Sequence, residues 1–347
     1  MKKFFLLAAA AVVAFASCSK NEAEPAQNKA LGFNAYTGRA ITKADASLID
    51  KGTTELLDGS KFVVYAYNTG SAAWAGSVSN VFMNDVTVTY AGGGADNPAK
   101  YTYSPLRYWP NDEANNKLTF FAYYPQGGTG ITAATNGWGA YSFTAQTDPA
   151  DMIDFCMSEV AADQVYSNTN SGTDGVVNMK FYHTLTMVKF QVKTDADYVT
   201  DGTTITLKSI SLAGVKTTGK LTPDNATAAW SDLGGATALE VFPTGTLDLS
   251  ETEAFVPTGT EADDAYLMIP QTLGDDVVAT IVYEVKTGSD DAVTNTATVK
   301  LNSDSKVKAW DMNKNILYTF VVGLKPIQFI AEVADWDDVQ SASFDIN

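Results

Sequence analysis

The chain has 347 residues, with 40 acidic and 23 basic side chains, one histidine and two cysteines, and its formal net charge is −17. This acidic excess argues against a nucleic-acid-binding protein, which needs a basic face to neutralise phosphates. A single histidine excludes a multi-histidine metal site, and two cysteines exclude a zinc site built from two CxxC pairs. We therefore expect neither a metal nor a cofactor.

Residues 1–17 are typical of a bacterial secretory signal. A short basic start is followed by an apolar run, residues 4–15, that is too short to cross a bilayer as a helix. Small residues precede Cys18, whose position resembles that of the cysteine in a lipobox. We expect Cys18 to be lipidated, giving a lipoprotein precursor held to the membrane only by its lipid. The alternative is an ordinary signal cleaved nearby.

A polar segment, residues 18–29, contains a proline and is interpreted as a tether. The first predicted strand follows at 31–36, where Leu31, Phe33 and Ala35 share one face. Clusters of Gly, Asn, Asp and Pro separate the further predicted strands, which are 61–67, 86–90, 118–124, 187–192, 204–207, 277–285, 297–301, 317–322 and 327–333. Short strands at this spacing predict an all-β fold of antiparallel sandwiches.

The length suggests two domains. Residues 165–175 are rich in Ser, Asn, Thr and Gly and are the best candidate for a linker, although a long hairpin loop has the same composition. We therefore predict an N-terminal sandwich over residues 30–174 and a C-terminal sandwich over residues 175–347.

Few residues suit catalysis. His183 lies at the start of a predicted apolar strand, and no G-x-S-x-G motif accompanies it, so we predict a structural histidine. Two carboxylate clusters, at 151–154 and 335–338, have side chains that could serve glycoside hydrolysis or calcium binding. Neither has EF-hand spacing, and acidic turns are common in so acidic a chain. We predict that the protein is not an enzyme.

The first half contains Trp74, Trp109 and Trp138 among several tyrosines. Exposed aromatic rings can stack on sugars, whereas a β-sandwich more often buries them in its core. Core packing is the favoured interpretation. The alternative function is a surface glycan-binding lipoprotein.

Four stretches share a characteristic order and spacing. They are residues 108–110 with 118–125, 181–192, 266–271 and 310–336. Together, from about residue 30 to 347, they resemble the fimbrillin-like proteins, the type V pilins of Gram-negative anaerobes. The resemblance implies two transthyretin-like antiparallel β-sandwich domains in tandem. It also implies a structural or adhesive subunit of a cell-surface fimbrium.

The resemblance implies an outer-membrane lipoprotein precursor and specific roles for residues of this chain during assembly. An arginine-specific protease is expected to cut between Arg39 and Ala40, which removes the strand carrying Leu31, Phe33 and Ala35. A strand from a neighbouring subunit then fills the vacated groove. Arg39 is one of only two arginines in the chain. The alternative is that Arg39 is an ordinary surface residue.

The C-terminus offers a candidate donor strand. Ala342, Phe344 and Ile346 alternate with polar residues and repeat the pattern of the first strand. The alternative is a disordered polar tail. A stalk subunit needs both a removable first strand and a donor strand, so stalk is favoured over tip or anchor. Expected partners are other fimbrial subunits in a homopolymer or mixed polymer, the protease, and a host or bacterial surface ligand that the sequence does not identify.

Overall fold

The computed structural model describes residues 29–37, 59–76, 78–92, 101–195, 202–224, 228–235, 238–259, 264–303, 306–323 and 328–336. Within these ranges the fold is all-β, with one short 3-10 helix, η1 (Pro149–Asp151), and no α-helix. No helix in the described ranges has the length and apolar character of a membrane span. The predicted all-β class is therefore confirmed.

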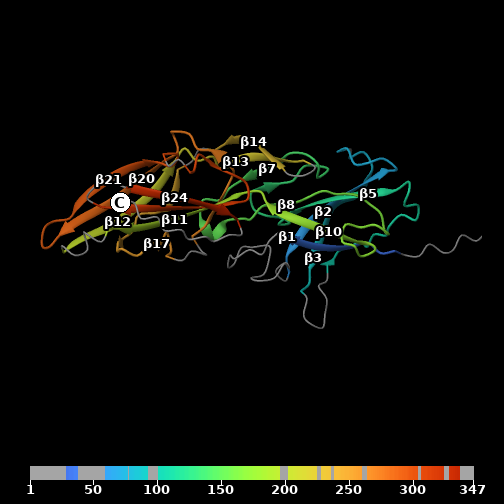
Figure 1. The fold of residues 1–347 in the computed structure, drawn as a ribbon, viewed down its shortest axis with the longest axis horizontal. Helices are drawn as coiled ribbons and strands as arrows, with labels where there is room; N and C mark the ends of the chain where they lie inside the picture. Colours follow the sequence, from blue (N-terminus) through green and yellow to red (C-terminus); the bar gives the residue numbers. More distant parts are fainter. Residues whose placement is uncertain are drawn as a thin grey trace, which may run out of the picture.

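An eight-stranded sheet occupies one end of the molecule (Figure 1). Its main path runs β1-β10-β8-β5-β2-β3-β4, and β9 also pairs with β5. The strands are β1 (Gly32–Thr37), β2 (Lys61–Gly70), β3 (Val81–Tyr90), β4 (Tyr101–Thr102), β5 (Lys117–Tyr124), β8 (Cys156–Ser158), β9 (Ala161–Gln164) and β10 (Val176–His183). The order places β1, the first strand of the described residues, beside β10, which lies far from it in the sequence.

Two central strands of this sheet are buried on both faces, along residues 62–67 of β2 and 118–123 of β5. Because side chains alternate along a strand, each strand contributes to two cores. The first core lies on one face and includes Leu31, Phe33, Ala35, Phe62, Val64, Val88, Trp109, Phe120, Val177, Met179 and Phe181. The main core lies on the other face and continues into the second half of the chain.

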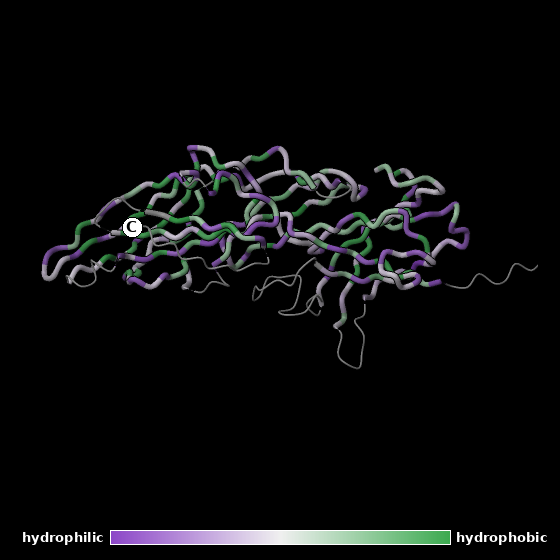
Figure 2. Tube along the Cα trace, in the orientation of Figure 1, coloured by the Kyte–Doolittle hydropathy of each residue, from purple (hydrophilic) through white to green (hydrophobic). Residues whose placement is uncertain are grey.

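The second half forms two five-stranded sheets that share the main core. One has the path β17-β11-β23-β24 with β18 on β11, and the other has the path β15-β12-β20-β21 with β16 on β12. The strands are β11 (Thr186–Thr194), β12 (Thr203–Ala213), β15 (Leu239–Phe242), β16 (Leu247–Asp248), β17 (Ala254–Phe255), β18 (Tyr266–Met268), β20 (Val278–Thr287), β21 (Val293–Lys300), β23 (Lys314–Val322) and β24 (Gln328–Asp335). Figure 2 shows hydrophobic residues recurring along the strands at both ends of the molecule.

A four-stranded sheet contains strands from both halves. Its order is β14-β13-β7-β6, and it lies between the two ends in Figure 1. The bounds of these strands, and of the separate pair β19-β22, are β6 (Ile131–Thr132), β7 (Tyr141–Thr144), β13 (Thr218–Pro223), β14 (Ala228–Gly234), β19 (Gln271–Thr272) and β22 (Ala309–Trp310). The ladder between β7 and β13, with Tyr141 opposite Leu221, joins the halves through backbone hydrogen bonds. The main core also contains buried residues from both halves of the chain.

The ten predicted strands all coincide with strands of the structure, although β3, β12 and β23 extend well beyond the predicted residues. The expectation of purely antiparallel sheets is wrong at two places. β1 pairs with β10 and β11 pairs with β23 in parallel. In both cases a long stretch of chain separates the partners, which gives the connection the length that parallel pairing needs.

The loop at residues 165–175 connects β9 and β10, which lie in the same sheet. His183 ends β10, whereas the sequence had placed it at the start of the next strand. Because β10 pairs within the first sheet, that sheet includes residues up to His183. The domain boundary at 174/175 stays a prediction.

Candidate functional site

β1, together with Leu31 just before it, fills one side of the first core. Leu31, Phe33 and Ala35 are 2%, 5% and 2% exposed, whereas Asn34 between them is exposed. Phe33 makes edge-to-face contacts with two aromatic rings, Tyr103 at 5.4 Å and Phe120 at 5.9 Å between centroids. The alternation predicted from the sequence is therefore present, and the apolar side chains of β1 are part of the packing.

A backbone ladder joins β1 to β10. The register places Phe33 opposite Val177 and Ala35 opposite Met179, so buried residues share one face of the pair. On the solvent face, the Asn34 side-chain amide donates to Asn178 Oδ1 at 2.9 Å. β10 is the only strand to which β1 pairs within the described residues.

Side chains hold the opposite edge of β1. The Tyr101 hydroxyl donates to the carbonyl of Ala35 at 2.9 Å, and the Tyr103 hydroxyl donates to the carbonyl of Leu31 at 2.8 Å. These two carbonyls belong to residues four positions apart. β4 thus approaches β1 from the far end of the sheet, and the sheet curls around the first core.

The start of β1 is fixed by residues near 107–109. The amide of Leu31 donates to the carbonyl of Arg107 at 3.0 Å, and the amide of Trp109 donates to the carbonyl of Lys29 at 2.9 Å. The Lys29 ammonium lies 3.3 Å from Glu113 Oε1. Hydrogen bonding from Ser167, followed by bonding and charge from Lys29, lowers the pKa of Glu113. Backbone hydrogen bonds and an ion pair therefore hold the residues at the start of β1 in place.

Several predicted sites lie outside the described residues. These are the lipidation residue Cys18, the cleavage residues Arg39 and Ala40, and the donor residues Ala342, Phe344 and Ile346. Their assignments remain predictions. The structure does describe β1, the strand predicted to be removed, and the residues that pack against it.

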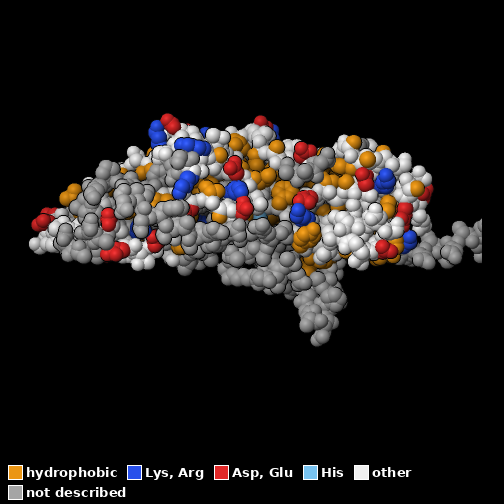
Figure 3. All heavy atoms as spheres, viewed as in Figure 1, with side chains coloured by type: hydrophobic (Ala, Val, Ile, Leu, Met, Phe, Trp, Pro, Cys, Tyr) orange, Lys and Arg blue, Asp and Glu red, His pale blue; other side chains and the backbone are white. Residues whose placement is uncertain are grey.

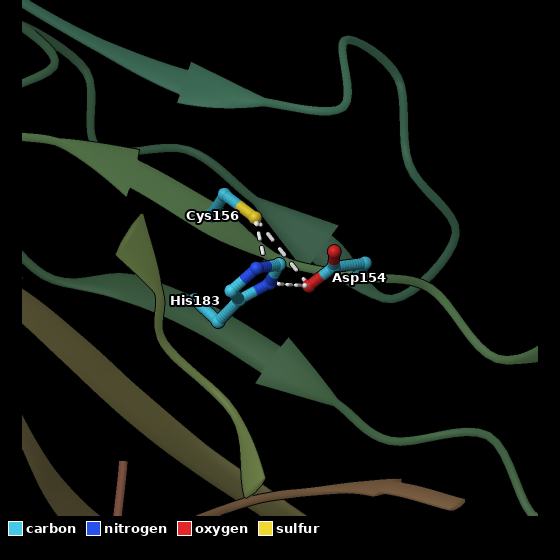
Figure 4. Close-up of side chains that lie close together, drawn as sticks. All are labelled: Asp154, Cys156 and His183. Carbon is cyan, nitrogen blue, oxygen red and sulfur yellow. Dashed lines mark hydrogen bonds and ion pairs between the residues drawn. The ribbon is translucent and has the colours of Figure 1, made fainter. Parts of the chain in front are cut away.

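A second cluster is polar and buried, and two of its three residues belong to strands of the same sheet. Figure 4 shows Asp154, Cys156 and His183 pointing toward one another. His183 Nδ1 lies 2.9 Å from Asp154 Oδ1, and Cys156 Sγ lies 3.4 Å from that oxygen and 3.5 Å from His183 Nδ1. The His183 ring also stacks on Trp336 with centroids 4.2 Å apart. His183 thus has partners on two sides.

The predicted structural role of His183 fits this burial, since its exposed fraction is 2%. Sequence reasoning missed the cluster. The only local signal was the spacing of Asp154 and Cys156, two residues apart in an extended segment, which places both side chains on one side. Burial, followed by the charge and hydrogen bond of Asp154, raises the pKa of the Cys156 thiol well above its ordinary value.

We expect the Cys156 thiol to be inert in the folded protein. The cysteine is fully buried and its thiolate is disfavoured, and both properties suppress reaction with electrophiles. Thiol titration of a Cys18→Ser chain should detect no reactive group under native conditions at pH 8, and one group after unfolding in guanidinium. Rapid native labelling would contradict this expectation.

The described residues of the two carboxylate clusters lie in different surroundings. Asp151 is exposed on η1 whereas Asp154 is buried against His183, so the two carboxylates serve different environments. Asp335 forms a surface ion pair with Lys314. Asp337 and Asp338 lie outside the described residues.

The tryptophans mainly serve packing. Trp109 is 4% exposed and its indole N–H donates to the carbonyl of Gly175 at 3.0 Å. Trp74 and Trp138 are partly buried against the main core and meet edge to face, with centroids 5.2 Å apart. These contacts favour the core interpretation over an open stacking platform. On the face in Figure 3, basic side chains are scattered among acidic ones.

Comparison with known proteins identifies the class. The sequence profile of the fimbrillin-like family matches residues 25–336. The chain therefore belongs to the fimbrillin-like family, and the resemblance noted in the sequence is confirmed. Membership supports a fimbrial subunit at the cell surface that interacts with other subunits, and it suggests a non-enzymatic role. No curated protein matches the chain.

Two solved structures share the fold. A fimbrial protein from Bacteroides vulgatus is 22% identical, with a TM-score of 0.64, and the match covers 89% of this chain and 100% of that one. A structure described as a cell adhesion protein from Bacteroides uniformis is 16% identical, with a TM-score of 0.53, and covers 89% of this chain and 99% of that one.

Proposed function

We propose that the protein is a stalk subunit of a fimbrium that assembles by proteolytic removal of β1 and donor-strand exchange. This proposal rests on how β1 is held. Its apolar side chains are buried in the first core, yet among the described residues it pairs with only one strand, β10. We further propose that the chain forms two transthyretin-like domains in tandem, with the predicted boundary at 174/175 moved past β10, which pairs within the first sheet.

Loss of β1 would leave a groove suited to another strand. Leu31 and Phe33 would leave space in the first core, and β10 would lose the ladder partner on one of its two edges. Burying each such side chain contributes about 1.5–3 kcal/mol, and unpaired strand edges readily accept a further strand. The groove left by β1 therefore favours β-augmentation by a strand of a neighbouring subunit.

The contacts that β1 makes specify what kind of strand can replace it. An incoming segment must place apolar side chains at alternate positions, as β1 does. It must also present carbonyls four residues apart to the Tyr101 and Tyr103 hydroxyls. Ala342, Phe344 and Ile346 supply alternate apolar residues, and any extended chain supplies the carbonyls. The C-terminal segment of a neighbour therefore fits these requirements.

Processing would couple assembly to release from the membrane. The proposed precursor is anchored through lipidated Cys18, and a cut between Arg39 and Ala40 removes both the lipid and β1. An arginine-specific protease would thus free a subunit only when its groove becomes available. This arrangement prevents an open edge from arising before delivery to the cell surface.

Substituting Arg39→Ala tests this step. We expect the variant to remain a lipid-anchored monomer, whereas the wild-type chain yields a subunit whose mass corresponds to an N-terminus at Ala40. Mass measurement of surface-extracted protein checks the first residue, and unboiled gels check polymer formation.

The matched control is Arg107→Lys, which replaces the only other arginine. Arg107 is exposed, and the contact with β1 uses its backbone carbonyl, so this change should leave both folding and processing intact. Polymer at the normal level from the Arg39→Ala variant would refute the assigned cleavage site. Loss of polymer in the Arg107→Lys control would move the site to Arg107.

A further inference from the structure

Three potential metal ligands of different kinds converge in the buried cluster of Asp154, Cys156 and His183. The pairwise distances between Oδ1, Sγ and Nδ1 are 2.9, 3.4 and 3.5 Å. Tetrahedral zinc bound by S, N and O at usual bond lengths would separate its ligand atoms by about 3.3–3.6 Å. Both distances to sulfur are already close to this range, and the remaining pair needs to open by only a few tenths of an ångström.

The strands bring these side chains together through register. Cys156 opens β8 and lies directly opposite His183 at the end of β10. Asp154 precedes Cys156 by two residues, so its side chain lies on the same side of the extended segment. Phe155 between them points into the main core, where it stacks on Phe143. Two of the three side chains are therefore held on paired strands, and the third lies just before one of them.

We propose that Asp154, Cys156 and His183 bind one Zn²⁺ ion. The set combines a thiolate, an imidazole and a carboxylate, and zinc accepts all three ligand types. The charges balance, because Zn²⁺ with one thiolate and one carboxylate is neutral. Neutrality matters here, since the three residues are no more than 5% exposed and a net charge would be costly.

Binding requires a defined movement of protons. The Cys156 S–H bond breaks, its proton leaves to solvent, and the sulfur lone pair forms the S–Zn bond. The imidazole coordinates through Nδ1 and carries its proton on Nε2, which has no hydrogen-bond partner in the apo arrangement. No fourth His, Cys, Asp or Glu of the described residues joins the group, so we assign the last position to water.

The ion would sit where separate parts of the fold meet. β8 and β10 belong to the eight-stranded sheet, and Trp336, stacked on His183, follows β24 of the second half. Zinc on His183 would fix the ring beneath Trp336. The proposed ion thus locks the first sheet to the end of the last described strand.

Metal analysis of the full chain with Cys18→Ser tests the proposal, because Cys156 is then the only thiol. The chain is purified from zinc-supplemented cells, and a second sample is refolded with equimolar Zn²⁺, since the site is closed in the folded state. We expect one zinc per chain. Cobalt in place of zinc should give a thiolate-to-metal charge-transfer band.

Three variants of the same chain sharpen the test. Cys156→Ala and Asp154→Asn should each lower zinc affinity by more than about tenfold, since even outer-shell partners of a metal contribute that much. Asp151→Asn changes a nearby exposed carboxylate and should retain full zinc. Circular dichroism establishes that each variant folds.

Two results would overturn the proposal. One is wild-type protein with no zinc above the Cys156→Ala background and no cobalt–thiolate band. The other is full zinc in folded Cys156→Ala protein. Either would leave the cluster as a hydrogen-bonded structural unit. The cobalt band is measured on the unmutated cluster, so the test stands even where a variant fails to fold.

Discussion

Removing residues 339–347 is expected to abolish polymer ladders on unboiled gels while the monomer still folds and is still processed. The truncation starts beyond β24 and beyond Trp336, whose ring packs on His183. The described cores therefore stay intact. The truncated subunit retains its own groove but offers no strand to a neighbour, so the expected loss is of assembly alone.

Point substitutions separate the donor face from the rest of the segment. Phe344→Asp places a charge in an apolar pocket of the neighbour and should prevent ladders as completely as the truncation. Ser343→Ala, on the polar face of the same segment, should leave them unchanged. Ladders of normal length from the truncated chain would exclude the C-terminal segment as the donor.

Phe33→Ala is expected to destabilise the unprocessed chain by about 3–5 kcal/mol, the usual cost of truncating a buried phenylalanine. Phe33 is 5% exposed and its ring contacts Tyr103 and Phe120. Guanidinium unfolding of the Cys18→Ser chain measures the change in free energy of unfolding. Asn34→Ala is the control, because that side chain is exposed on the same strand.

The same substitution also reports on strand exchange. A processed subunit no longer contains residue 33, so a polymer built from Phe33→Ala precursors should resist denaturant as well as wild type. Phe344→Ala should show the opposite pattern, with a stable precursor and a weaker polymer. If Phe33→Ala weakened the finished polymer, β1 would have to remain in place after assembly.

The strands could be predicted because their signal is local. The alternation of apolar and polar residues around Leu31, Phe33 and Ala35, and along β10, is visible within a few residues. The folded chain shows the same alternation as buried and less buried side chains. Pairing is not local. The parallel match of β1 with β10 depends on which edge remains open after the intervening strands have paired, and no short pattern records that.

The buried polar cluster shows the same limit more sharply. Composition shows which ligand types the chain has, but not that strand register places its one histidine opposite Cys156. Whether such side chains form a cluster depends on the distances between them. Sequence could indicate that Asp154 and Cys156 share a side, but only the β8–β10 pairing adds His183.

The sheet that crosses between the halves has a mechanical consequence. Pulling the ends of a subunit apart would load the β7–β13 ladder and the continuous main core together, so neither half can swing independently. Each subunit would then behave as a stiff link. In a filament under flow, bending would concentrate at the junctions between subunits, and the groove–strand contact would set how far the fibre can flex.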